Sequence, residues 1–246
     1  MSVRVTFVGS GGPVVTEKRC CPCLLIDKDI LIDCGSGALR NLRLLKVNLL
    51  DICYLLISHC HADHIADVVP LLWAMQLDGR RSELIVVGPS GIRNTIHKLL
   101  RILNTPEGFL TYDIVIKEVS GSTSLSEIST CSVSHTIPTL AYRVTRGDVS
   151  VCYSGDTRFS SDLVKLAENV DLLIHESSFK SSRASLAFLT GHSTASDAGK
   201  VARLAKARKL ALFHIFREDE IELVEEASAN YDGEVIVAED FLSIEV

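Results

Sequence analysis

Three histidines and an aspartate that could bind metal ions occur within six residues of this chain, in the stretch H-C-H-A-D-H at residues 59–64. In an extended segment His59 and His61 point to the same side, because side chains alternate along the backbone. Asp63 and His64 lie past the bend that ends such a segment, so they reach a second point further on. Imidazole and carboxylate groups are ligands that zinc prefers. The spacing therefore favours two neighbouring cations over one.

The elements around this cluster indicate where it lies. Residues 52–57 form an apolar run typical of a buried strand. Residues 65–77 predict a helix that the chain enters at the end of the cluster. The cluster is therefore expected on a loop between a strand and a helix, where functional side chains are commonly held.

Other ligand-type residues follow predicted strands elsewhere in the chain. His135 follows a short apolar segment, Asp156 follows a predicted hairpin over residues 140–153, and His214 follows a strand predicted over residues 209–213. In layered α/β folds such strand ends gather at one edge of the sheet. Together with the cluster, these residues could hold two metal ions that share the aspartate after the hairpin. Zinc would lower the pKa of a bound water to ~7, and a pair of cations stabilises an in-line displacement.

Two further features have two interpretations each. Asp33 ends an apolar strand before the glycine turn at residues 35–37. It would either cap the helix that starts near Ala38 or orient a metal-bound histidine from behind, and we expect the second role. Lys18 and Arg19 place two cations on a glycine-rich N-terminal loop. They would be either solvated turn residues or contacts for an anionic substrate.

Length and composition limit the class of protein. The chain has 246 residues, of which 47% are hydrophobic, which suffices for one large domain with a sizeable core. Its formal net charge of -6 argues against a broad basic surface for nucleic acid. Neither a signal peptide nor an apolar run long enough to span a bilayer is recognisable, so we expect a cytoplasmic protein that does not enter membranes.

The eight cysteines are expected to be reduced, buried thiols in such a compartment. Only Cys20, Cys21 and Cys23 are clustered, and these three would otherwise bind a metal or form a disulfide.

Strands and helices alternate along the chain without a linker or a change in composition. Residues 179–188, which are rich in serine, predict a loop, and residues 195–207 predict a helix with Thr194 as its N-cap. Residues 120–124 predict a turn. The order of elements predicts a layered α/β protein with mixed sheets, in a single domain spanning residues 1–246.

The chain resembles the metallo-β-lactamase-fold hydrolases over essentially its whole length. The H-x-H-x-D-H signature of that family stands at residues 59–64, and the other landmarks are Asp33 in L-I-D-C-G, His135, Asp156 in S-G-D-T, and His214. The resemblance implies a four-layer αββα sandwich with two mixed β-sheets and a two-zinc site at one edge.

The resemblance also implies how the ligands divide between the two metal ions. The first ion would be held by three histidines and the second by an aspartate and two histidines, namely His59, His61 and His135 for the first, and Asp63, His64 and His214 for the second. Asp156 would bridge the two ions. Manganese or iron would suit the same ligands as zinc.

Within this family the chain is most similar to the branch of ribonuclease Z, the tRNA 3′-end endonuclease, and its phosphodiesterase relatives. The similarity rests on H-E-S-S at residues 175–178, G-H-S-T at residues 191–194 and A-E-D-F at residues 238–241. It implies that His192 contacts the scissile phosphate and assists the leaving group. It also implies that Glu176 orients and polarises this histidine, as a general acid–base pair.

We therefore expect a dinuclear metal-dependent hydrolase, most simply a phosphodiesterase that uses a metal-bound hydroxide, with Asp63 accepting a proton from the attacking water. Its substrate would be a phosphodiester, RNA included, and relatives are often homodimers. Ribonuclease Z enzymes usually carry a tRNA-gripping arm in the interval that corresponds to residues 135–156, which one hairpin nearly fills here. The alternatives are a tRNA 3′-processing endonuclease proper, a lactonase or arylsulfatase-type hydrolase, and a non-enzymatic metal-dependent binding protein.

Overall fold

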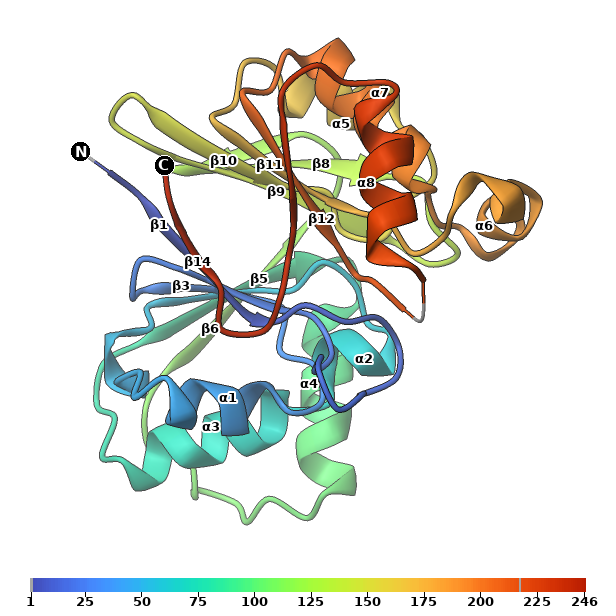
Figure 1. The fold of residues 1–246 in the computed structure, drawn as a ribbon. Coiled ribbons are helices and arrows are strands. Elements are labelled where there is room, and N and C mark those ends of the chain that lie inside the picture. The colour runs from blue at the N-terminus through green and yellow to red at the C-terminus, as the bar shows by residue number, and fades with distance from the viewer. Residues whose placement is uncertain (1, 217) are drawn as a thin grey trace.

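Two mixed β-sheets face each other at the centre of the protein (Figure 1). The computed structural model describes residues 2–216 and 218–246. Within these residues the first sheet contains, in spatial order, β14 (Ser243–Glu245), β1 (Arg4–Gly9), β2 (Cys23–Ile26), β3 (Ile30–Ile32), β4 (Tyr54–Leu56), β5 (Leu84–Pro89) and β6 (Ile114–Val119). Strands β3 to β6 run parallel, whereas β14, β1, β2 and β3 pair in antiparallel fashion.

The second sheet has the same size and a similar division. Its strands, in spatial order, are β13 (Glu234–Val237), β12 (Lys209–Phe213), β11 (Leu172–Glu176), β10 (Val149–Tyr153), β9 (Thr139–Arg146), β8 (Ile128–Val133) and β7 (Thr123–Leu125). Strands β10 to β13 run parallel, and β7 to β10 pair in antiparallel fashion. Because β9 is antiparallel to both β8 and β10, the carboxyl ends of β8, β10, β11 and β12 lie at the same edge.

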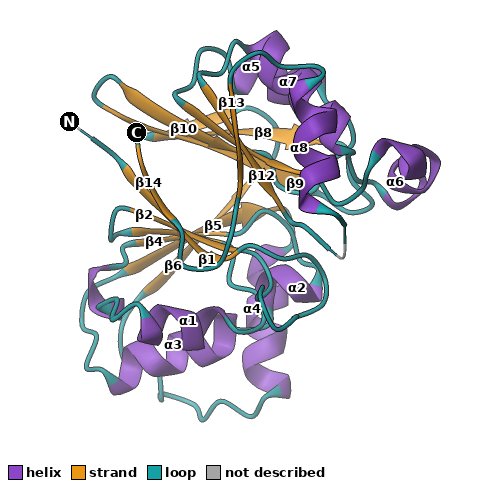
Figure 2. Cartoon of the chain, viewed as in Figure 1, coloured by secondary structure: helices purple, strands orange, loops and turns teal. Residues whose placement is uncertain are grey.

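Helices cover the outer face of each sheet (Figure 2). The first sheet carries α1 (Ala38–Leu44), α3 (Val68–Leu77) and α4 (Ile92–Ile102), and the second carries α5 (Ser161–Leu166), α7 (Ala195–Ala205) and α8 (Glu220–Ser228). Shorter helical segments lie in the connections, namely α2 (Ala62–Ile65), α6 (Ala184–Thr190) and the 3-10 turns Leu49–Asp51 and Ser181–Arg183. The expected four-layer αββα sandwich with two mixed sheets is thus confirmed.

Three apolar clusters fill the spaces between these four layers. Successive residues of a strand point to opposite faces, so Ile30 and Ile32 of β3 pack between the sheets, whereas Leu31 packs under the helices. The cluster between the sheets includes the aromatic rings of Phe7 and Phe213, whose centroids are 5.9 Å apart. Burial on both faces explains why several strands are continuous apolar runs in the sequence.

The helix predicted over residues 65–77 is interrupted, because α2 ends at Ile65 and α3 begins at Val68. The backbone between them bonds to another segment, since the N–H of Asp67 donates to the carbonyl of Cys34 at 3.0 Å. The predicted strand over residues 52–57 is shorter than expected and forms β4.

Two segments predicted as turn or loop contain regular structure. Strand β7 includes the last two residues of the turn predicted over residues 120–124, and its partner β8 continues toward His135. Their serine and threonine residues lie on both faces of the hairpin, so the apolar–polar alternation that predicts a strand is absent. Helix α6 and the 3-10 turn before it occupy most of the loop predicted over residues 179–188, although in α6 only Ala187 is buried.

The strand ends that carry the predicted metal ligands lie at the edge of the molecule opposite the two chain termini. Figure 1 shows both termini at the left and α2, with the carboxyl end of β12, at the right. No helix in the described ranges is long and apolar enough to cross a membrane.

Candidate metal centre

The seven residues predicted to bind metal meet at the edge where the two sheets face each other. They form two groups that share one aspartate, namely His59, His61, His135 and Asp156 in the first, and Asp63, His64, His214 and Asp156 in the second. Within each group, one nitrogen or oxygen atom from every residue lies within 4.8 Å of the others. Residues 59–64 follow β4 of the first sheet, whereas the remaining ligands follow strands of the second sheet.

The backbone at this edge helps to aim the side chains. Asp33 and His214 adopt left-handed conformations, with φ of 56° and 59°. Each of them directly follows a strand, so the chain turns sharply at that point. A left-handed residue other than glycine costs on the order of 1–3 kcal/mol, and such residues persist where the surrounding structure holds them. The two sheets are joined nearby, where the N–H of Leu140 donates to the carbonyl of Ser58 at 2.9 Å.

In the first group, three imidazole nitrogens converge. Nδ1 of His61 lies 3.0 Å from Nε2 of His59 and 3.2 Å from Nε2 of His135. Oδ2 of Asp156 lies 3.6 Å from Nε2 of His59. Three nitrogen lone pairs and a carboxylate that approach one point offer the ligand set typical of a zinc site.

In the second group, Oδ2 of Asp156 faces two further nitrogens. It lies 3.3 Å from Nε2 of His64 and 3.4 Å from Nε2 of His214. Oδ2 of Asp63 lies 3.3 Å from the same nitrogen of His214 and 3.6 Å from that of His64. One carboxylate oxygen of Asp156 thus faces both groups.

Hydrogen bonds on the opposite ring nitrogen hold four of these imidazoles in place. The pairs are His59 Nδ1 with Ser58 Oγ at 3.0 Å, His64 Nδ1 with Asp33 Oδ2 at 2.8 Å, His135 Nδ1 with Gly191 O at 2.7 Å, and His214 Nδ1 with Ser178 Oγ at 2.8 Å. In each ring the contact on Nδ1 leaves Nε2 directed at the centre. This is the usual arrangement behind metal-binding histidines.

Asp33 lies behind His64 and does not cap a helix. Its carboxylate also accepts the N–H of Ser58 at 2.7 Å and the hydroxyl of Tyr153 at 3.0 Å. The N-cap position of α1 is occupied by Gly37, and the carboxylate that receives the first N–H groups of that helix belongs to Asp67. The structure therefore places Asp33 where it can orient a ligand, and it excludes the capping alternative.

The electrostatics of the first group favour neutral imidazoles. Burial and then the neighbouring His64 lower the pKa of His59 well below its ordinary value. Burial likewise lowers the pKa of His61 and of His135. A neutral imidazole is the form that binds a metal ion, so these rings need not lose a proton first.

In the second group, a buried carboxylate and a buried imidazole hold each other in their charged forms. Burial acts to lower the pKa of His64, but the carboxylates of Asp156 and Asp33 outweigh it and hold that pKa well above its ordinary value. Burial acts to raise the pKa of Asp156, but His214 and His64 outweigh it and hold that pKa well below the usual range. A buried anion that faces several imidazoles suits a cation, whose binding would displace a proton from His64.

Two buried atoms of this site have no hydrogen-bond partner among the described residues. They are Nε2 of His64 and Oδ1 of Asp156. Leaving a buried polar group unpaired costs about 1–3 kcal/mol, so such atoms call for a partner. Both belong to the predicted ligand set. The residues present therefore fit a pair of divalent cations.

A carboxylate–imidazole pair adjoins the ligands. Nδ1 of His192 lies 3.0 Å from Oε1 of Glu176 and 3.9 Å from Oδ2 of Asp156. Glu176 is fully buried at the end of β11, and its Oε1 also accepts the N–H groups of Thr157 and Ser193 at 3.0 Å. Burial acts to lower the pKa of His192, but Glu176 outweighs it and raises the pKa to about 9. His192 thus carries a proton at neutral pH when no metal is bound.

The chain around His192 is shaped for this position. Gly191, with φ of 84°, ends α6, and a Cβ atom at this residue would lie 2.8 Å from Nδ1 of His135. Thr194 caps α7 as predicted, and it forms a reciprocal capping box with Asp197. A glycine turn and a helix cap therefore fix the histidine between two helices.

No role was assigned to Ser178 from the sequence. In the structure this residue lies between the predicted metal ligand His214 and the Glu176–His192 pair. Its Oγ lies 2.8 Å from Oε2 of Glu176, 2.8 Å from Nδ1 of His214 and 3.3 Å from Nδ1 of His192. The only sequence signal was its presence in the H-E-S-S stretch.

The predicted anion contact by Arg19 is not what the structure shows. Arg19 is 6% exposed, and its guanidinium donates to the carbonyl of Ala238, to Oγ of Ser10 at 2.7 Å and to Glu220 at 2.6 Å. This side chain therefore ties the N-terminal loop to the C-terminal segment. Lys18 is exposed beside it, and its contact with a substrate stays a prediction.

All eight cysteines are free thiols, so Cys20, Cys21 and Cys23 form no disulfide. No group of potential metal ligands among the described residues includes a cysteine. Burial raises the pKa of Cys21 to about 11 and that of Cys23 well above its ordinary value, which makes both thiols unreactive. Cys53 is exposed, contrary to the expectation that all eight are buried.

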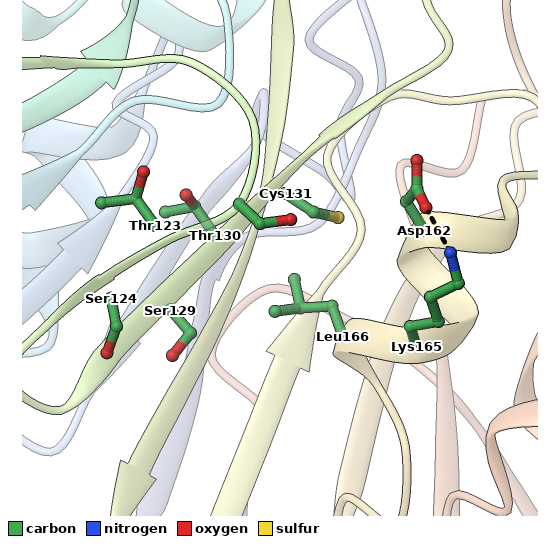
Figure 3. Close-up of a pocket in the computed structure, with 9 residues that line it drawn as sticks. Thr123, Ser124, Ser129, Thr130, Cys131, Asp162, Lys165 and Leu166 are labelled. Atoms are coloured by element: carbon green, nitrogen blue, oxygen red, sulfur yellow. Dashed lines mark hydrogen bonds and ion pairs between the residues drawn. The ribbon is translucent and has the colours of Figure 1, made fainter.

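A groove of about 480 Å³ lies away from these ligands, between the β7–β8 hairpin and α5 (Figure 3). Hydroxyl groups line much of it, and its charged residues, Asp162 and Lys165, pair with each other at 3.0 Å. None of the predicted site residues lines this groove. It is therefore separate from the metal centre.

Comparison with known proteins agrees with the fold. Residues 28–215 match the family model described as the beta-lactamase superfamily domain, so the chain belongs to that superfamily. Among solved structures, the metallo-beta-lactamase fold protein YhfI from Bacillus subtilis has a TM-score of 0.87 and 25% identity, and the alignment covers all of both chains. The human short-form tRNase Z has a TM-score of 0.81 and 24% identity, with 98% of each chain covered.

Curated relatives within this superfamily are named ribonuclease Z. The relative from Methanothermobacter thermautotrophicus is 29% identical over 99% of this chain and 97% of its own length. The relative from Archaeoglobus fulgidus is 27% identical over 100% of this chain and 98% of its own length. The first alignment spans 302 positions, more than the 246 residues of the chain, so that relative contains segments with no counterpart here.

Proposed function

We propose that the protein is a dinuclear metal-dependent phosphodiesterase that resembles ribonuclease Z. One ion would be held by three histidines and the other by an aspartate and two histidines, namely His59, His61 and His135, and Asp63, His64 and His214. Asp156 would bridge them. The observation that carries the proposal is the position of the Glu176–His192 pair, 3.9 Å from the shared Asp156 carboxylate. Hydrolysis of a lactone would not need such a pair.

The roles of the residues follow from their positions. When bound, the two cations would supply an activated water and offset the charge of the phosphodiester. Asp63 would accept a proton from that water. His192 would donate a proton through Nε2 to the departing oxygen, because its Nδ1 is bonded to Glu176. Glu176 would keep the imidazole protonated and correctly turned, a contribution of the general acid–base kind.

Three finer parts of the proposal rest on the ligand chemistry and on the resemblance. Zinc suits nitrogen-rich ligands, and manganese or iron would bind the same set. The protein would act as a homodimer, as the resemblance implies, and in the cytoplasm, as the sequence without a recognisable signal peptide favours. Metal analysis of purified protein and light scattering in solution would test the cations and the dimer.

The second candidate is a tRNA 3′-processing endonuclease, which the names of the curated relatives favour. In this chain, the interval between His135 and Asp156 is occupied by β9, β10 and their short connection. A separate tRNA-gripping arm therefore has no place in that interval, which favours a smaller phosphodiester as substrate.

A substrate panel on metal-quantified protein tests both candidates. We expect hydrolysis of bis(p-nitrophenyl) phosphate and no cleavage of precursor tRNA at comparable enzyme concentration. Cleavage of precursor tRNA at its 3′ end would establish the second candidate. Turnover of a lactone or an aryl sulfate without phosphodiester activity would contradict both. Metal-loaded protein that is inert toward every compound would indicate a binding protein.

A further inference from the structure

A cavity of about 400 Å³ opens beside His192, at the base of α6. Its lining includes Arg158, Phe159 and Phe188, together with His192 and Asp197. Because His192 is the group that would serve the leaving oxygen, this cavity is placed to receive whatever is attached to that oxygen. None of the seven predicted metal ligands lines it.

The cavity presents aromatic surface to solvent. Phe188 is 69% exposed and Phe159 is 47% exposed. Helix α6, which carries Phe188, projects from the edge of the molecule at the right of Figure 1. Together the two rings offer apolar surface that a ligand filling the cavity would cover.

A cation is held against the Phe188 ring. The guanidinium carbon of Arg158 lies 4.9 Å from the centroid of that ring. Its Nε donates to the carbonyl of Phe188 at 2.6 Å, and its Nη1 donates to Oγ of Ser134 at 3.4 Å. The ring and the guanidinium are therefore positioned as one unit, and both groups stack on planar π systems.

The guanidinium of Arg158 gives the cavity a group that can contact an anionic ligand. Within the described ranges no carboxylate pairs with Arg158. The carboxylate of Asp197 is already engaged, because it accepts from Oγ1 of Thr194 at 2.8 Å and from Nζ of Lys200 at 3.5 Å. The cavity thus combines aromatic rings with a guanidinium that forms no ion pair among the described residues. This combination is typical of sites that stack a nucleobase near a phosphate.

We propose that this cavity binds the base of a nucleoside that forms the leaving side of the scissile phosphodiester, stacked on Phe188 with Arg158 facing an adjacent phosphate. The inference rests on the proposed function, because the leaving side is defined by His192. It narrows the substrate class to diesters whose leaving group is a nucleoside. Small dinucleotides and the ends of single-stranded RNA share this chemistry.

The test compares two substrates on metal-loaded protein. One is a dinucleoside monophosphate, and the other is the same compound without the base on its leaving sugar. We expect kcat/KM to be about ten-fold higher for the first, since stacking of a base on an aromatic side chain has roughly this effect or more. The variant Phe188→Leu should abolish the preference, and Phe188→Trp should retain it. Leu189→Ala, at a 75% exposed neighbour on α6 that does not line the cavity, should behave like the wild type.

Each remaining result has a definite meaning. Equal rates on the two compounds in the wild type, or an equal loss on both in Phe188→Leu, would overturn the inference while leaving phosphodiesterase activity intact. If the protein hydrolysed bis(p-nitrophenyl) phosphate but neither of these compounds, the proposed function would stand and the inference would fail. If it hydrolysed none of the three, the proposed function would fail. Equilibrium binding of the same compounds would then decide the inference: base-dependent affinity lost in Phe188→Leu supports it, and base-independent affinity overturns it. A short oligoribonucleotide assayed in parallel distinguishes RNA ends from small dinucleotides.

Discussion

The hydroxyl of Ser178 lies 2.8 Å from Nδ1 of His214 and contacts the Glu176 carboxylate at the same distance. A single side chain thus connects a ligand of the second cation to the pair that would assist the leaving group. Its Oγ can donate to the carboxylate while it accepts from the imidazole. This arrangement fixes the ring of His214 with Nε2 toward the metal centre.

The variant Ser178→Ala should weaken binding of one cation by about 10–100-fold, the usual effect of removing the hydrogen-bond partner of a metal ligand. Metal affinity measured by competition with a chelator checks this. Ser177→Ala is the matched control, because Oγ of Ser177 is buried next door but donates to the carbonyl of Phe213. Equal affinities in the two variants would exclude the positioning role of Ser178.

The variant His192→Ala should lower kcat by about 10²–10⁴-fold for a diester with an alkoxide leaving group, because proton transfer to that oxygen is lost. For bis(p-nitrophenyl) phosphate the loss should be small, since p-nitrophenolate departs without a proton. His97→Ala, on the exposed side of α4, is the control. Equal losses on both diesters would contradict the assignment of His192 as the acid.

The protonation of His192 in the metal-free protein should depend on Glu176. Nuclear magnetic resonance of its ring should give a pKa of about 9, and Glu176→Gln should lower that pKa, since burial is then opposed mainly by Asp156. The folded-state pKa is raised, so its contribution to stability is full below pH 6.5 and is lost as the pH rises through about 9. Denaturant titrations at several pH values check this direction. An unchanged pKa in Glu176→Gln would show that the pair is not coupled.

Removal of metal should lower the melting temperature, and zinc should restore it, because an ion that binds the folded state stabilises it by mass action. Asp156→Asn should retain fewer than two cations per chain, since the bridging oxygen loses its charge. Elemental analysis after gel filtration measures the ratio. Asp162→Asn, an exposed carboxylate on α5, should keep the wild-type ratio. Two retained cations in Asp156→Asn would rule out the bridging role.

Substitution of Arg19 should affect the stability of the protein, whereas substitution of Lys18 should affect substrate binding. Arg19→Ala should lower the free energy of unfolding by about 2 kcal/mol, because it leaves the buried carbonyl of Ala238 without this donor. Its kcat/KM should change little at a temperature where the variant is folded. Lys18→Ala should not affect stability, and it should raise KM if this exposed cation contacts the substrate. Chemical denaturation and steady-state kinetics of both variants separate these effects.

Several features of this protein were determined by short stretches of its sequence. The ligands of residues 59–64 are close in the chain, so their residue types and spacing are enough to indicate metal chemistry. Apolar runs such as that of β11 predict buried strands, and the threonine–aspartate spacing at Thr194 predicts a helix cap because the capping bonds are local. Strand β7 and the first part of β8 were not predicted, since serine and threonine lie on both of their faces and mask the alternation that marks a strand.

The tertiary structure alone decided how distant groups meet. His135 is 74 residues from His61, yet their ring nitrogens lie 3.2 Å apart because the two sheets stack at this edge. Likewise, only packing turned Arg19 toward Ala238 and placed Ser178 between Glu176 and His214. A hydroxyl or a guanidinium can bond to many partners, and nothing in its immediate sequence selects among them. The selection is made by the strands that end nearby and by the burial that makes an unpaired polar group costly.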